Sequence, residues 1–356
     1  MDRPARQRSQ TYPALSPVLN NTGIFMMIDL EKAFRRLMRR LAATTCLAMA
    51  LAAVSMSPVL SAGIAADHTT TVYNSIRVDG LKIHYREAGP RPAPTILLLH
   101  GFPSSSRMFE TLIPLLADRY HIVAPDYPGF GYSDAPPPDR FDYTFDNIAR
   151  IIDRLTETLG LNRYTLYVAD YGGPVGFRLA LAHPERVTAL IIQNAVAHDD
   201  GLDDKLWAPR RAFWADRATY EGRVRQGLIS PEATRARHVG NSPHPERYSP
   251  DLWEDELAFL NRPGVAQIQL ELFYDYRTNV AAYPRWQEYL RESKPPVLVT
   301  WGRYDPNFSV REVEALRRDV PDAEVHIVDG GHFALDEAVD EIAALIGGFL
   351  SKVPVR

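Results

Sequence analysis

The chain has 356 residues, of which 46% are hydrophobic and 24% are charged, and its formal net charge is −4. This balance is typical of a globular protein and excludes a disordered or collagen-like chain. Because there is no excess of positive charge, we expect no nucleic-acid partner. The length is sufficient for one large domain or two smaller ones.

The first 62 residues have the layout of a secretory signal peptide. Four arginines between positions 35 and 40 precede an apolar run at 41–54, and small residues follow at 57–63. The run is shorter than the roughly 20 residues of a comfortable membrane span. We therefore expect residues 1–62 to be a cleaved leader and the mature protein to be periplasmic or secreted, without a stable membrane span.

The only cysteine, Cys46, lies inside this predicted leader. Residues 63–356 contain 32 Lys and Arg against 41 Asp and Glu, which gives a net charge of −9. A mature chain without cysteine has no disulfide, no thiolate nucleophile and no cysteine metal ligand. Such a chain suits an oxidising compartment.

Strand-like and helix-like segments alternate through residues 63–198. The run TILLL at 95–99, for example, is continuously apolar, as in a strand that is buried on both faces. The patterns predict strands at 72–78, 81–86, 95–99, 120–124, 164–169 and 187–193, and helices at 109–117, 143–159 and 172–182.

The alternation stops at 199–294, where apolar residues recur at helical spacing and no buried strand is indicated. It resumes with strands at 296–301 and 324–328 and helices at 310–318 and 336–350. Strands that alternate with helices predict an α/β fold, with a mostly parallel sheet of eight strands flanked by helices. We expect the core to comprise 63–198 and 295–356, and 199–294 to form a helical cap.

Asp170 stands where the strand at 164–169 must turn sharply into the next helix. Gly172 and Gly173 follow it, and small residues near the turn are typical of a nucleophile elbow, although Val168 is larger than usual. A carboxylate at this position can attack a saturated carbon and form an ester. The motif alone is equally compatible with an aspartate that caps the helix.

Three further strand ends carry residues that complete a catalytic site. His100-Gly101-Phe102-Pro103 follows the strand at 95–99, so that the N–H groups of Phe102 and Tyr171 could stabilise an oxyanion. Each motif could also be an ordinary turn or loop. The order of a nucleophile (Asp170), an orienting acid (Asp305) and a general base (His332) favours catalysis.

With these motifs, residues 72–350 resemble the α/β-hydrolase superfamily, in the branch of epoxide hydrolases and haloalkane dehalogenases that use an aspartate nucleophile. Two further matches are the D-x-x-G-x-G-x-S loop at 126–133 and the HPERV corner at 183–187. The resemblance implies hydrolysis of a small apolar organic substrate by water, without a cofactor.

The cap decides which leaving group is stabilised. In the epoxide hydrolases that the chain resembles, a Tyr-Arg pair before the acid strand supplies a proton donor, and Tyr276-Arg277 is in this position. We therefore expect epoxide hydrolysis to a vicinal diol, with Tyr276 as the acid. The alternative is haloalkane dehalogenation, with Trp214 and Tyr276 holding the halide.

Two other classes of function are disfavoured. Fluoroacetate dehalogenases carry arginines on the helix after the nucleophile, where this chain has Tyr171 and Pro174, so we expect no small haloacid as substrate. A non-catalytic binding protein on the same fold would be expected to have a broken triad. The ten histidines are scattered, and we therefore expect no metal site.

Overall fold

The computed structural model describes Arg35 and residues 69–354. The predicted leader, 1–62, lies outside the described residues apart from Arg35. In the described part of the chain, no helix is long and apolar enough to cross a membrane.

The centre of the fold is an eight-stranded sheet with the order β1-β2-β4-β3-β5-β6-β7-β8. The first two strands pair antiparallel around a turn at Asp79 and Gly80, β2 is antiparallel to β4, and all other neighbours are parallel. The strands are β1 (Val72–Val78), β2 (Leu81–Ala88), β3 (Thr95–Leu99), β4 (His121–Pro125), β5 (Tyr164–Ala169), β6 (Val187–Gln193), β7 (Val297–Gly302) and β8 (Glu324–Val328).

Helices cover both faces of this sheet, because the central strands are apolar on both sides. In β3, Leu97 and Leu99 belong to one buried cluster, whereas Ile96 and Leu98 belong to the other. This division follows from the alternation of side chains along a strand. The first cluster includes α3 (Phe145–Thr158) and α4 (Gly172–Ala182), and the second includes α2 (Leu112–Leu116) and α11 (Leu335–Leu350). Helix α10 (Arg311–Asp319) connects β7 to β8.

The helix expected at 109–117 is divided in two. A 3-10 helix, η1 (Ser106–Phe109), is followed by a short turn and then by α2. Pro114 explains the break, since proline lacks an N–H and its ring clashes with the carbonyl four residues earlier, at Glu110.

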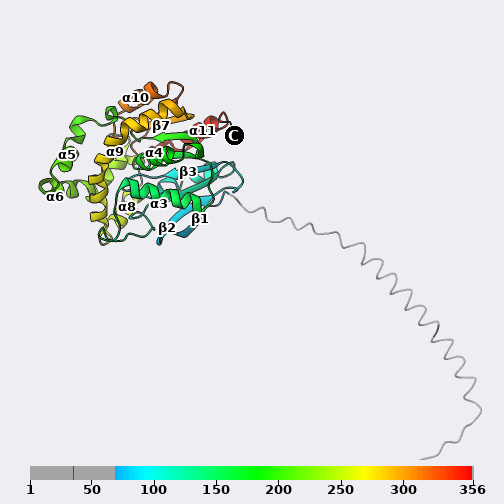
Figure 1. Cartoon of the computed structure of the whole chain (residues 1–356), viewed down its shortest axis with the longest axis horizontal. Coiled ribbons are helices and arrows are strands. Elements are labelled where there is room, and N and C mark those ends of the chain that lie inside the picture. Colours follow the sequence, from blue (N-terminus) through cyan, green and yellow to red (C-terminus); the bar gives the residue numbers. More distant parts are fainter. Residues whose placement is uncertain (1–34, 36–68, 355–356) are drawn as a thin grey trace, which may run out of the picture. The chain divides into compact units, whose positions relative to one another are not determined.

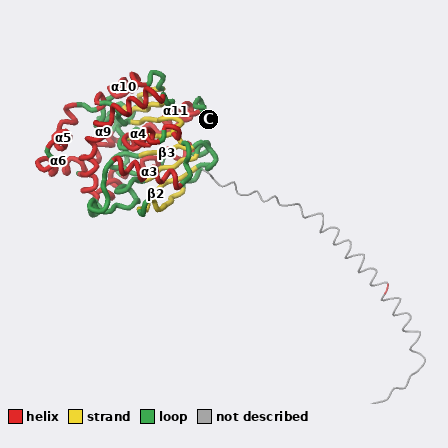
Figure 2. Tube along the Cα trace, in the orientation of Figure 1, coloured by secondary structure: helices red, strands yellow, loops and turns green. Residues whose placement is uncertain are grey.

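The chain between β6 and β7 contains helices and, within 204–293, no strand. These cap helices are α5 (Asp204–Ala215), α6 (Arg217–Ile229), α7 (Pro231–Val239), α8 (Asp251–Leu260) and α9 (Val265–Ser293). Side chains of Asp203, Asp216 and Ser230 cap the first three helices by accepting backbone N–H bonds. Figures 1 and 2 show α5, α6 and α9 together at one side of the strands.

The parallel strands determine where the polar residues meet. Because the carboxyl ends of β3, β5, β6, β7 and β8 lie at the same edge of the sheet, the loops that follow them are neighbours. The loops after β3, β5, β7 and β8 carry the residues that the sequence motifs single out, and several of these residues meet cap side chains at one cavity.

Candidate active site

Asp170 occupies a strained turn between β5 and α4. Its φ is +49°, in the left-handed region that few residues other than glycine adopt. The turn brings its side chain close to Gly101, and it brings Gly172 close to the backbone of β3. A Cβ on Gly101 would lie 2.4 Å from the Asp170 Cβ, and a Cβ on Gly172 would lie 2.0 Å from the Leu99 carbonyl oxygen. The glycines are therefore required by the close approach of the backbone at this turn.

Val168, the unusually large residue before the nucleophile, is accommodated by another glycine. A Cβ on Gly176, one turn into α4, would lie 2.4 Å from the Val168 Cγ1. The space for Val168 thus comes from the absence of a side chain at Gly176, a determinant of the site that was not predicted from the sequence.

The Asp170 carboxylate is held by a backbone donor and faces a histidine. The Phe102 N–H donates to Asp170 Oδ1 at 2.7 Å, and the Nε2 atom of His332 lies 3.6 Å from Oδ2. The structure therefore brings together Asp170, Phe102 and His332. The roles of these residues, and of the Tyr171 N–H as a second oxyanion donor, remain predictions.

Asp305 holds the other side of the histidine ring. Its Oδ2 lies 2.9 Å from His332 Nδ1, and its Oδ1 accepts the N–H groups of Asn307 at 2.7 Å and Phe308 at 3.1 Å. The Asn194 side chain, at the end of β6, donates to Asp305 Oδ2 at 2.7 Å. These donors orient the carboxylate toward the imidazole.

Asn194 was not identified from the sequence. Besides Asp305, its side chain accepts the Gly302 N–H at 2.9 Å, and its own backbone has a φ of +44°. An asparagine directly after a buried strand is a signal that could have indicated this role, since asparagine tolerates positive φ and offers both a donor and an acceptor.

The electrostatic environment of His332 favours the imidazolium form. Burial alone would lower the pKa of this histidine, but the charge of Asp305 and the carboxylate of Asp170 outweigh it and raise the pKa to about 10. The resting site therefore has the character of a cation between two carboxylates.

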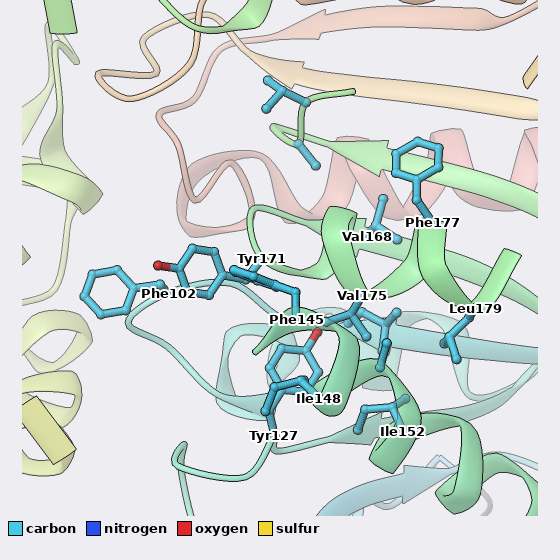
Figure 3. Packing of buried hydrophobic residues seen from close by; sticks show 14 of the residues in the cluster. Phe102, Tyr127, Phe145, Ile148, Ile152, Val168, Tyr171, Val175, Phe177 and Leu179 are labelled. Atoms are coloured by element: carbon cyan, nitrogen blue, oxygen red, sulfur yellow. The ribbon is translucent and has the colours of Figure 1, made fainter. Parts of the chain in front are cut away.

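Tyr276 lies on α9 opposite these residues. It is buried, and its hydroxyl makes no hydrogen bond to the described residues. Burial raises the pKa of Tyr276 well above 10, and the neighbouring Tyr283 and the charge of Asp170 raise it further. The phenol therefore keeps its proton. The Tyr171 hydroxyl is likewise buried without a partner. Figure 3 shows the ring of Tyr171 beside Phe102 and Phe145.

A cavity of about 30 Å³ lies between Asp170 and the cap. It is much smaller than a second cavity, of about 440 Å³, within the cap. The lining residues are Phe102, Asp170, Tyr171, Trp207, Arg210, Arg237, Phe273, Tyr276, Asn307, Phe308 and His332.

Trp214 does not line this cavity. Its ring stacks on Tyr276 with 6.2 Å between centroids, and its Nε1–H donates to the Phe273 carbonyl at 2.9 Å. The other indole near the site, Trp207, lines the cavity, but its Nε1–H donates to the Asn307 carbonyl at 3.0 Å. The structure thus places Trp214 behind Tyr276 rather than in contact with a leaving group.

Two arginines of the cap also line the cavity, and neither of them was predicted from the sequence. Arg210 comes from α5 and Arg237 from α7. No sequence motif marks them, because arginine is common on exposed helix faces. Among the described residues there is no cluster of three or more histidines, cysteines or carboxylates that could hold a metal.

The α/β hydrolase fold family matches residues 94–339, so the chain belongs to this family. The eight-stranded sheet and its flanking helices are the fold expected from the sequence. The family match, together with the polar residues that follow the parallel strands, makes the protein a hydrolase of this family.

Particular relatives differ in what they act on. The chain is 44% identical to the uncharacterized hydrolase YNR064C of Saccharomyces cerevisiae over 275 residues, which cover 76% of this chain and 94% of the relative. It is 28% identical to a haloalkane dehalogenase of Psychrobacter cryohalolentis over 286 residues, 77% of this chain and 89% of the relative. A solved structure of the epoxide hydrolase CorEH shares the fold, with a TM-score of 0.65 and 18% identity over 80% of this chain and all of that one (100%).

Proposed function

We propose that the protein hydrolyses an epoxide to a vicinal diol through a covalent ester on Asp170. The observation that carries this proposal is that Asp170 and Tyr276 line one small cavity, and that the buried Tyr276 hydroxyl, which neighbours Tyr283, has no hydrogen bond to the described residues. A nucleophile and an acid that face one small cavity can attack a carbon and protonate the departing oxygen.

In the first step, an Asp170 oxygen attacks an epoxide carbon. The carbon–oxygen bond of the ring breaks, its electron pair stays on oxygen, and that oxygen takes the proton of Tyr276. The product is a hydroxyalkyl ester of Asp170 and a Tyr276 phenolate. The phenol is a suitable acid because its raised pKa keeps it protonated until the alkoxide develops.

Once the ester has formed, the His332 imidazolium gives its proton to the Tyr276 phenolate. In the second step, the neutral His332 takes one proton from water, and the hydroxide attacks the ester carbonyl carbon of Asp170. The Phe102 N–H, which contacts Asp170 Oδ1 in the resting site, is positioned to stabilise the oxyanion. Cleavage releases the diol, whose new hydroxyl takes the proton from His332. The remaining proton of the water, now on the Asp170 carboxyl group, passes to His332, which restores the imidazolium and the Asp170 carboxylate.

Dehalogenation is the alternative, and the relative from Psychrobacter cryohalolentis favours it. It begins with the same attack by Asp170 but needs N–H donors for the halide. Both nearby indoles donate to backbone carbonyls instead, Trp207 to Asn307 and Trp214 to Phe273. Besides the Arg237 guanidinium, the free donors that line the cavity are the hydroxyl groups of Tyr171 and Tyr276, and an unpartnered hydroxyl supports the epoxide.

A matched panel of aryl and alkyl epoxides and bromoalkanes tests this choice. We expect diol release from an epoxide, and we expect Tyr276→Phe to reduce it by roughly 10²–10⁴-fold, the range for loss of a general acid. Trp214→Phe is the control, because it keeps a ring behind Tyr276 and should retain most of the activity. Bromide release from bromoalkanes, with no diol from any epoxide, would contradict the proposal.

A further inference from the structure

The two cap arginines in the cavity have no carboxylate partner in the part of the chain that the structure describes. Arg237 is 8% exposed, its Nη1 is buried without a hydrogen bond, and its guanidinium lies over the Phe102 ring at 4.8 Å from the centroid. Arg210 is partly buried and donates only to the Leu206 carbonyl, at 2.8 Å. Among the described residues, neither arginine forms an ion pair.

Burying an unpaired guanidinium is costly, and two in one cavity also repel each other. Burial, together with the charge of Arg210, lowers the pKa of Arg237 to about 10, although Glu256 opposes this. Arg237 therefore stays charged at neutral pH. Glu256 does not neutralise it at close range, since Glu256 is bound to His238 at 3.0 Å.

The helix that carries Arg237 is held in place by the neighbouring residue. The next residue, His238, bridges Glu256 of α8 and Asp336 of α11, with distances of 3.0 Å and 2.8 Å. This bridge attaches α7 to the core and directs Arg237 over Phe102. A long, flexible cation that is held in this way presents a pre-organised binding group.

The arginines also stand between two cavities. Arg210, Arg237 and Phe273 line both the small cavity at Asp170 and a larger one of about 440 Å³ within the cap. The larger cavity is bordered by side chains of α5, α6, α7 and α9, among them Val224 and Leu228. A ligand that reaches Asp170 from the cap would thus pass both guanidinium groups.

We infer that the substrate carries a carboxylate close to the carbon that Asp170 attacks, and that Arg237 and Arg210 bind this carboxylate. Guanidinium groups match a carboxylate in geometry as well as charge. The small cavity limits the distance between the carboxylate and the reacting carbon, and an apolar remainder fits the larger one. The substrate is then an epoxy acid and not the purely apolar compound that the sequence suggested.

This inference rests on the proposed function only in that the reacting carbon belongs to an epoxide. The binding of a carboxylate by the two arginines does not depend on it. Binding is therefore measured without turnover, by calorimetry with hexanoate and with its uncharged analogue hexanamide. We expect hexanoate to bind more tightly than hexanamide to the wild type. Arg237→Gln should weaken hexanoate binding by at least about 30-fold, as expected for loss of one partner of a buried charged pair, and leave hexanamide unchanged.

Arg223→Gln is the matched control. Arg223 lines the same larger cavity but is exposed, so it contributes only general attraction. An equal loss in both variants, or a wild type that binds the two probes equally, would overturn the inference. Arg237→Lys should retain part of the affinity, because it keeps the charge without the planar fork.

A second arm measures turnover of a 2,3-epoxy acid and its amide. We expect Arg237→Gln to lower kcat/KM for the acid and not for the amide. If hexanoate binds as expected but neither epoxide reacts, the carboxylate site stands and the proposed reaction fails. If both epoxides react equally well in the wild type, the reaction stands and the carboxylate site fails.

Discussion

His332 lies between two carboxylates, and only one of them changes during the proposed reaction. Asp305 stays charged, whereas Asp170 loses its charge on forming the ester. The contact from His332 Nε2 to Asp170 is one of the interactions that raise the pKa of His332 to about 10. Ester formation therefore lowers that pKa, which makes the neutral imidazole available at the step that needs a base.

Asp170→Asn reproduces this loss of charge without an ester. We expect the pKa of His332, measured by NMR titration of the imidazole, to be lower in this variant than in the wild type. The sign follows from removing an anion that favours the protonated ring. An unchanged or higher pKa would mean that Asp170 does not influence the base.

Asn194 positions Asp305, and substitution of Asn194 tests this role. Asn194→Gly deletes the donor at 2.7 Å while it keeps the positive φ, and Asn194→Ala adds the backbone strain. We expect either change to lower kcat by roughly 10–100-fold, as for loss of a hydrogen bond to a charged group, with little change in KM. Full activity of the glycine variant, together with an unaltered pH profile, would show that Asn194 has no positioning role.

At the scale of elements, the strands could be predicted from the sequence with few errors. The central strands are continuous apolar runs, and β3, β5 and β6 begin and end at the residues that the pattern indicates. The break before α2 was missed because a pattern of apolar residues does not register Pro114. Asp170 and His332 could be recognised because they follow strands whose order fixes their proximity.

The cap was harder to interpret from its sequence. Its helices are rich in aromatic residues and arginines, and helical spacing does not tell which side chains face Asp170. Tyr276 could be assigned through its neighbours in sequence, whereas Arg237 faces the cavity only because His238 anchors α7 to two other helices. Trp214 was expected in the cavity, but its indole N–H is taken by the Phe273 carbonyl.

Close packing at the turn between β5 and α4 can be tested by substitution of its glycine. In Gly172→Ala, the new Cβ would meet the Leu99 carbonyl oxygen at 2.0 Å. We expect a loss of about 3 kcal/mol in the free energy of unfolding, measured with denaturant, because neither backbone segment can move easily.

Gly222→Ala provides the matched control, since Gly222 lies in α6 with nothing within 4 Å of its added Cβ. It should stabilise the protein by about 0.5–1 kcal/mol, the helix preference of alanine over glycine. If both variants were equally stable, close packing at the elbow would be refuted.

At the scale of the whole molecule, we propose that the protein is exported and that the leader is removed near Ala62. The basis is the basic, apolar and small-residue layout of 1–62. N-terminal sequencing of protein isolated from the cell envelope or the medium should find a start close to Gly63. Recovery from the cytoplasm with Met1 or another early methionine retained would argue against export.

The central claim is that Asp170 becomes covalently bound to the substrate. A single turnover in heavy-oxygen water, with mass spectrometry of the Asp170 peptide and the product, tests it most directly. Hydroxide from the labelled water attacks the ester carbonyl, so we expect label in the Asp170 carboxylate and unlabelled product in the first turnover. Label in the first product, with none in the Asp170 peptide, would mean that water attacks the substrate directly.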